Sequence, residues 1–257
     1  MGIWGTNYPV GDAVATGLAA FILGSYGWRW VFWGPAIASA CLGVVLIAVL
    51  RNRPEDVGLP PLAEKDERDP AAVGPGPAGD DGYSLAVLLQ PRILALGASY
   101  FCLKFVRYTF IFWIGIYLVG SMGFTPEQAG YLQVPFPLAG LFGIIVAGFA
   151  SDLLFDARRA PVAVIMLVGL IGALVLLLLL PPDLSTDTLV ASLDVRTVVV
   201  GGTLALCGFL LYGPDMLLAG TAAMDFGSTA AAARVAGFVN GIGSVGAALS
   251  GVVVGAL

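Results

Sequence analysis

The chain has 257 residues, of which 58% are apolar and only 11% are charged, and its mean hydropathy is +0.93. Soluble domains are close to half apolar and a quarter charged, so this composition indicates a multi-pass membrane protein. The net charge of −5 lies almost entirely in loops and says little about partners. The sequence contains no histidine, which excludes histidine metal sites, Ser–His catalytic pairs and histidine proton relays.

Seven segments are apolar enough to cross a bilayer, whose hydrocarbon layer needs about 20 residues of helix. They are residues 9–26, 30–50, 94–119, 129–151, 161–181, 197–220 and 235–257. The cysteines Cys41, Cys102 and Cys207 lie inside these segments and are interpreted as small apolar residues. We therefore expect an all-α fold without a metal site or cofactor.

Residues 51–92 are polar and rich in Pro and Gly, so we expect a flexible linker between two spans and five. Lys and Arg are enriched in cytoplasmic loops. Loops on the side of the linker hold eight of them, whereas the opposite loops hold only Arg29 and Arg196. The linker is therefore predicted to be cytoplasmic, and the protein to lie in the inner (cytoplasmic) membrane. The odd number of spans and the apolar ends indicate an internal portion of a longer protein.

Two cations, Lys104 and Arg107, lie one helical turn apart in the third span. A charge near the bilayer centre costs roughly 2.5–3.5 kcal/mol on insertion scales, and arginine does not deprotonate to avoid this cost. We expect an intramembrane carboxylate or an anionic substrate to meet them. The guanidinium fork suits phosphate or carboxylate, so Arg107 is the main candidate for anion binding and Tyr108 a neighbour in its cavity. The alternatives are a structural ion pair for Arg107 and a surface-directed side chain for Lys104.

Two acidic positions complete the charged pattern. Asp152, followed by Arg158 and Arg159, ends the fourth span on the predicted cytoplasmic side, where these charges can clasp helices together as a gate. Asp215 follows Gly213-Pro214 in the sixth span, where the pair should bend or loosen the helix, and broken helices gather near transport sites. We expect Asp215 to pair with Lys104 or Arg107, or to serve as a coupling-ion or proton site. Asp12 is a weaker case, because it lies near the start of its span.

These residues resemble, in the same order along the chain, the organophosphate:phosphate antiporter family of the major facilitator superfamily. The resemblance is carried by Gly27-Trp28-Arg29, the run from Arg53 to Pro61, Phe105-Val-Arg-Tyr108 with Trp113, Ser151-Asp152 with Phe155 and Arg158-Arg159, and Tyr212-Gly-Pro214. It implies that the seven spans are the fifth to eleventh of twelve. Residues 1–50 would then end one six-helix bundle, residues 51–92 link the bundles, and residues 93–257 form most of the second.

The resemblance also implies roles for single residues. Arg107 matches an arginine that grips phosphate, Tyr212 a tyrosine of the same cavity, and Trp4 a tryptophan ahead of the fifth helix. The chain departs from the glycerol-3-phosphate members at Tyr8, Pro137 and Ser244, where they have a histidine, an acid and a tyrosine. Lys104 and Asp215 are charges that those members lack, and we expect them to form a pair that changes partners during transport.

We therefore predict a major facilitator fold fragment and a transporter, not an enzyme. It exchanges an organophosphate for inorganic phosphate by alternating access. Its partners are a small phosphate-containing anion and the lipid bilayer, with no nucleic acid, and the full-length protein is a monomer. The alternatives are a sensor of external hexose phosphate and a proton-coupled carrier of another anion. The predicted substrate-binding residues are Arg107, Lys104, Tyr108, Tyr212, Trp4 and Tyr8.

Overall fold

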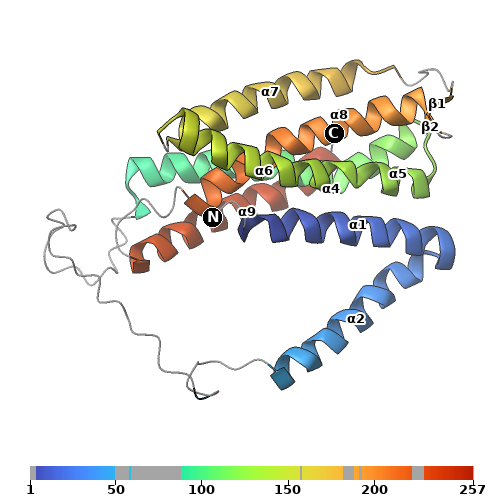
Figure 1. Ribbon diagram of the computed structural model, residues 1–257, viewed down its shortest axis with the longest axis horizontal. Helices are drawn as coiled ribbons and strands as arrows, with labels where there is room; N and C mark the ends of the chain where they lie inside the picture. Colours follow the sequence, from blue (N-terminus) through green and yellow to red (C-terminus); the bar gives the residue numbers. More distant parts are fainter. Residues whose placement is uncertain are drawn as a thin grey trace, which may run out of the picture.

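Long apolar helices make up most of the described chain (Figure 1). The computed structural model describes residues 4–49, 58, 88–156, 158–181, 188–190, 193–221 and 229–256, so most of the predicted linker lies outside the described residues. The α-helices are α1 (Asn7–Tyr26), α2 (Trp28–Val49), α4 (Pro91–Gly120), α5 (Pro126–Gln133), α6 (Pro135–Leu154), α7 (Arg159–Leu179), α8 (Val195–Met216) and α9 (Thr229–Gly255). The short elements are the 3₁₀ helix η1 (Trp4–Thr6), the π-helix η3 (Leu217–Thr221) and an antiparallel pair of strands, β1 (Thr188–Val190) and β2 (Leu193–Asp194).

Six helical stretches of the described chain are long and apolar enough to cross a membrane. They are Trp28–Val49, Pro91–Gly120, Pro126–Leu154, Arg159–Leu179, Val195–Ala219 and Arg234–Gly255. This confirms the predicted all-α membrane fold, because helices satisfy every backbone polar group inside the bilayer. The predicted first span corresponds to α1, which is not among the six and carries Asn7, Tyr8 and Asp12 in its first two turns.

The predicted span 129–151 is divided into two helices. It starts earlier than expected, at a capping box in which Thr125 and Gln128 exchange side-chain and backbone hydrogen bonds. It is then interrupted at Val134, whose N–H bonds to the carbonyl of Tyr131 in a tight turn, and α6 begins at Pro135. A proline cannot donate the backbone hydrogen bond that a continuous helix needs. The interruption separates α5, which packs on α1, from the long helix α6.

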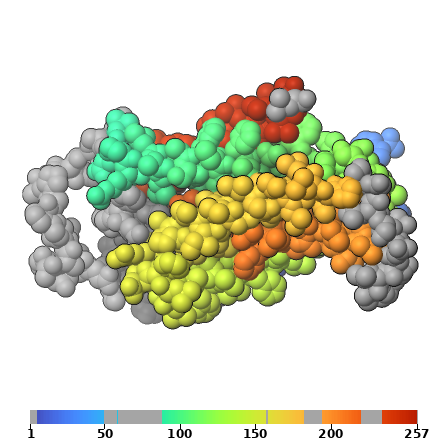
Figure 2. Space-filling view, turned by 90° about the horizontal axis from the view of Figure 1, so that it is seen from above, coloured from blue at the N-terminus to red at the C-terminus, as the bar shows by residue number. Residues whose placement is uncertain are grey.

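The helices pack in pairs around a large apolar core and a smaller one between α6, α7 and η3. Helix α4 lies along α9, α6 lies along α8, and α7 covers the other side of α8 (Figure 1). In Figure 2, α4 lies in front of α9, and α7 runs alongside α8. Helix α1 packs on α5 and α6, whereas α2 leads away from α1 and buries none of its residues. The core between α4, α6 and α8 includes Leu118, Leu204, Leu211 and Tyr212, all fully buried or nearly so.

Helix α8 begins at a capping residue and ends, just after Asp215, in a wider helical turn. Asp194 caps its start by accepting a hydrogen bond from the backbone N–H of Thr197 at 2.9 Å. The hydrogen bonds from Thr197 hold the pKa of Asp194 below its ordinary value. The helix runs through Pro214 to Met216 and then widens into the π-helix η3. The loosening expected at Gly213-Pro214 thus follows the proline, and π-helical turns are frequent at functional sites.

Helices α6 and α8 approach each other closely at two glycines. A Cβ atom on Gly143 would collide with the backbone carbonyl of Phe209, and one on Gly208 would collide with that of Phe136. Only glycine lets the two backbones come this near, and small residues serve this purpose widely in membrane helices. The contact brings α8, with Asp215 near its end, against the centre of the bundle.

We expect Gly143→Val to lower the free energy of unfolding by about 1–3 kcal/mol, because the added carbons force α6 and α8 apart. Gly148→Val is the matched control: it lies on the same helix, and nothing lies within 4 Å of a Cβ atom placed there. Thermal unfolding of both variants in detergent measures the difference. Equal losses of stability in the two variants would contradict the proposed role of the close approach.

Candidate functional site

The charged side chains of the membrane interior meet at one cavity. It has a volume of about 820 Å³ and lies between η1, α1, α4, α6, α8, η3 and α9. Its charged lining residues are Lys104, Arg107 and Asp215, which are only 8%, 4% and 7% exposed. A second cavity of about 500 Å³ shares Tyr8 and Arg107 with the first and extends along α1 to Asp12. The site is therefore polar and charged, although the helices that build it are apolar.

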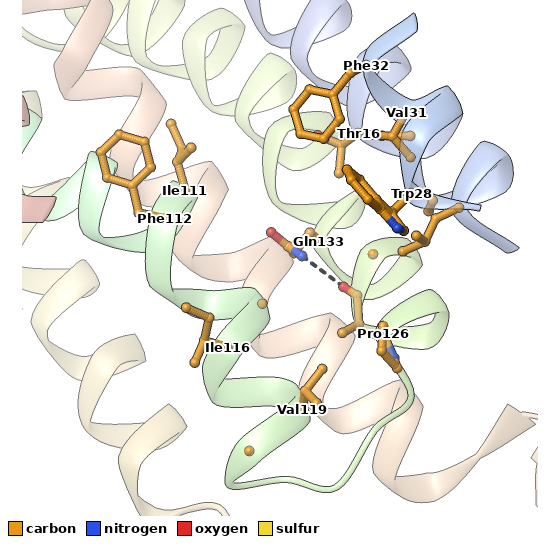
Figure 3. Close-up of a pocket in the computed structure, with 17 residues that line it drawn as sticks. Thr16, Trp28, Val31, Phe32, Ile111, Phe112, Ile116, Val119, Pro126 and Gln133 are labelled. Carbon is orange, nitrogen blue, oxygen red and sulfur yellow. Dashed lines mark hydrogen bonds between the residues drawn. The ribbon is translucent and has the colours of Figure 1, made fainter. Parts of the chain in front are cut away.

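A separate pocket of about 730 Å³ lies between α1, α2, α4 and α5 (Figure 3). Figure 3 shows its lining side chains, which include Trp28, Phe32 and Ile116 and no charged residue. The amide of Gln133 donates to the backbone carbonyl of Ala129 at 3.1 Å, drawn as the dashed line. This pocket offers no group that could compensate an anion, so the chemistry of the described residues centres on the charged cavity.

Arg107 of α4 and Asp215 of α8 form a buried ion pair. Arg107 Nη1 donates to Asp215 Oδ2 at 3.0 Å. The pair is joined at a single point: Arg107 Nε and Asp215 Oδ1 are both buried and have no hydrogen-bond partner. An arginine and a carboxylate can form two parallel hydrogen bonds, and here the guanidinium fork keeps part of its donor capacity unused.

Three tyrosines surround the Arg107 guanidinium. Its Cζ atom lies 4.3 Å from the ring centre of Tyr8, 5.0 Å from that of Tyr212 and 5.5 Å from that of Tyr108. A cation within about 6 Å of an aromatic ring is attracted by its π-electrons. Tyr212 is fully buried, and its hydroxyl donates to Asp12 Oδ2 at 2.6 Å. The structure thus brings the three predicted site tyrosines around the predicted anion-binding arginine.

Lys104 has different partners from those expected. Its Nζ donates to Asn240 Oδ1 at 2.6 Å and to Ser244 Oγ at 3.3 Å, and it lies 5.1 Å from the ring centre of Tyr100. Among the described residues no carboxylate bonds to it, so the predicted Lys104–Asp215 pair is not formed and Asp215 bonds to Arg107 instead. The reason is helix geometry: side chains three positions apart on an α-helix point in directions that differ by about 60°. Lys104 therefore points towards α9, whereas Arg107 points towards α8.

The remaining predicted residues lie away from this ion pair. Trp4 begins η1, and its side chain is outside the described part of the chain. Asp152 and Arg158 are exposed around the turn between α6 and α7, Arg159 begins α7, and none of the three lines the charged cavity. Their role as a gate stays a prediction.

Sequence reasoning missed one residue of the site and gave little weight to another. Asn240 was not singled out, although an amide in the middle of an apolar span is costly to bury unless it is bonded, and here it bonds to Lys104. Asp12 was considered a weaker case because it lies near the start of its span, yet its carboxylate accepts a hydrogen bond from the hydroxyl of the buried Tyr212. Both residues could have been found as polar exceptions, but their partners come from helices more than 130 residues away in the sequence.

Comparison with known proteins supports the membrane-transport fold. Residues 1–251 match the sequence pattern of the Major Facilitator Superfamily. The chain belongs to this superfamily. Members of this superfamily are transporters, not enzymes, and the chain is accordingly a multi-pass membrane protein. No solved structure matches the chain significantly.

The curated relatives confirm the resemblance to organophosphate transporters. The chain is 30% identical to a "Probable hexose phosphate transport protein" of Chlamydia pneumoniae, over 97% of the chain and 55% of that protein. It is 31% identical to "Membrane sensor protein UhpC" of Salmonella typhimurium, over 97% of the chain and 54% of that protein. It is 28% identical to "Glycerol-3-phosphate transporter" of Bacillus subtilis, over 96% of the chain and 54% of that protein. The chain thus spans about half the length of the curated relatives it matches.

Proposed function

We propose that the protein exchanges an organophosphate, such as a sugar phosphate or glycerol 3-phosphate, for inorganic phosphate by alternating access. Residues 1–50 would belong to one bundle, residues 51–92 to a cytoplasmic link, and residues 93–257 to the second bundle, which rocks against the first. The excess of Lys and Arg on the side of the link supports the inner membrane as its location. The names of the relatives support a phosphate-containing substrate.

One observation carries this proposal. The buried guanidinium of Arg107 lines a cavity, and its Nε atom has no hydrogen-bond partner. A phosphate group presents several acceptor oxygens to such a fork. Lys104, whose hydrogen bonds go to the neutral groups of Asn240 and Ser244, adds a second positive charge in the same cavity. In this proposal Tyr8, Tyr108 and Tyr212 hold the guanidinium in place from three sides.

Other parts of the proposal rest on position alone. Trp4 precedes α1, close in sequence to Tyr8, and we include it with the residues that contact the organic part of the substrate. Asp152, Arg158 and Arg159 lie together at the turn between α6 and α7, where they would close the cytoplasmic side.

Exchange can be tested with the full-length protein in vesicles loaded with inorganic phosphate. We expect uptake of labelled glycerol 3-phosphate or glucose 6-phosphate that requires internal phosphate and is matched by its efflux. Uptake that ignores internal phosphate and follows the pH gradient would point instead to a proton-coupled carrier. Tight binding without flux would favour a sensor, the second candidate, which the 31% identity to a membrane sensor protein supports.

A further inference from the structure

The charged cavity at Arg107 continues along helix α1 into the second cavity, of about 500 Å³. Asn7, Tyr8, Arg107 and Tyr108 line both cavities, so the guanidinium lies where the two meet. An inorganic phosphate ion fills only the space beside a guanidinium, whereas a phosphate ester also carries an organic part. The second cavity therefore offers a place for the organic part of an ester whose phosphate is bound at Arg107.

Helix α1 presents small side chains to the second cavity. Gly11 and Ala15 line it, and nothing lies within 4 Å of a Cβ atom placed on Gly11. Helix α4 contributes Tyr108 and Ile111 to the same cavity. The small residues leave room between the two helices, so an organic group can lie against α1 without displacing a side chain.

Asp12 is an acceptor of hydrogen bonds in this cavity. Among the described residues that line the second cavity, the charged ones are Asp12 and Arg107. Asp12 Oδ2 accepts a hydrogen bond from the Tyr212 hydroxyl at 2.6 Å, and Oδ1 makes no hydrogen bond to any described residue. A carboxylate accepts hydrogen bonds on both oxygens. Asp12 can therefore accept one more hydrogen bond, from a hydroxyl group of a ligand.

The spacing along α1 suits a short polyol chain. Tyr8, whose ring centre lies 4.3 Å from Arg107 Cζ, is four residues from Asp12. Four residues of α-helix rise about 6 Å and bring their side chains onto the same face. A ligand whose phosphate binds Arg107 can thus place its far end at Asp12. A hydroxyl there would donate to the carboxylate, whereas a second carboxylate there would be repelled, because like charges interact strongly inside a protein.

We propose that Asp12 is a specificity-determining residue, which accepts a hydrogen bond from a hydroxyl of the substrate's organic part and disfavours a carboxylate at that position. This inference rests on the proposed function and narrows its substrate class. The preferred substrates are phosphate esters of polyols and sugars, and the disfavoured ones are phosphate esters that also carry a carboxylate.

Two ligands that differ at one carbon test this proposal on the full-length protein. Glycerol 3-phosphate ends in a hydroxymethyl group where 3-phosphoglycerate has a carboxylate. We expect equilibrium binding of glycerol 3-phosphate to be at least about tenfold tighter, since a hydrogen bond to a charged group accounts for about this factor. In Asp12→Asn, which still accepts from Tyr212 but lacks the charge, this preference should shrink at least about fivefold.

Two controls separate specificity from a general disturbance of the site. Glu127→Gln removes an exposed carboxylate that lines neither cavity, and it should keep the preference of the unsubstituted protein. Inorganic phosphate has no organic part, so its affinity should change less in Asp12→Asn than the affinity for 3-phosphoglycerate.

The preference of the unsubstituted protein decides first, because it needs no variant to fold. If 3-phosphoglycerate binds as tightly as glycerol 3-phosphate, the inference is overturned and the proposed function stands. A preference that persists unchanged in Asp12→Asn, or an equal gain for inorganic phosphate and 3-phosphoglycerate, also overturns it. Failure of the unsubstituted protein to bind both glycerol 3-phosphate and inorganic phosphate contradicts the proposed function together with the inference.

Discussion

Arg107→Lys is expected to reduce the affinity of the full-length protein for glycerol 3-phosphate by about tenfold to a hundredfold. Lysine keeps the charge but presents a compact ammonium in place of a planar fork, so one of two parallel hydrogen bonds to phosphate is lost. A hydrogen bond to a charged group is worth about 1.5–3 kcal/mol, and about 1.4 kcal/mol corresponds to a factor of ten. The three tyrosines around the guanidinium also lose a planar group to stack against.

Arg29→Lys is the matched control, because it makes the same chemical change at an exposed arginine beside Trp28, outside the charged cavity. Equilibrium binding of labelled glycerol 3-phosphate measures both variants. An affinity of Arg107→Lys equal to that of the control would remove Arg107 from the substrate site and leave its ion pair with Asp215 as a purely structural contact.

Breaking the buried ion pair is expected to have the largest effect on stability. Asp215→Leu and Arg107→Met each leave one charge buried without its partner, which costs about 3–5 kcal/mol. The double variant removes both charges and replaces them with apolar side chains, so most of the lost stability should return. Thermal unfolding of the three variants in detergent gives the coupling energy between the two residues.

A second cycle, with Lys104→Met and Asp215→Leu, provides the comparison. These side chains do not bond to each other in the described structure, because Lys104 bonds to Asn240 and Ser244. Their coupling should therefore be the smaller of the two. A larger coupling energy of Asp215 with Lys104 than with Arg107 would mean that Asp215 pairs mainly with Lys104.

The fold could be predicted from the sequence because the bilayer leaves few options. A segment of about 20 apolar residues inside a membrane must be helical, and the predicted span 30–50 corresponds to α2 at Trp28–Val49. The interruption at Val134–Pro135 was not predicted. Hydropathy is calculated from side chains and does not register the backbone N–H that Pro135 lacks. The apolar run therefore looked continuous in the sequence, although its helical hydrogen bonding is interrupted.

Individual site residues could be predicted for a related reason. Lys104, Arg107 and Asp215 stand out because each is a charge in an apolar span, and such a charge is costly enough to require a partner. Asn240 did not stand out, because an uncharged amide costs less to bury and the hydropathy of α9 changes little around it. The charged residues of the site could thus be identified from the sequence alone.

Which of these residues meet was decided only by the packing of the helices. Composition and the spacing of charges established a helical membrane protein with cations in its third span and an acid in its sixth. The pairing of Arg107 with Asp215, and of Lys104 with Asn240, depends on the rotation of α4 against α8 and α9. That rotation depends on contacts such as the close approach of α4 and α9 at Gly246, where a Cβ atom would collide with the backbone carbonyl of Phe101. Hydropathy depends on each residue separately, whereas a hydrogen bond depends on the distance between two side chains from different helices.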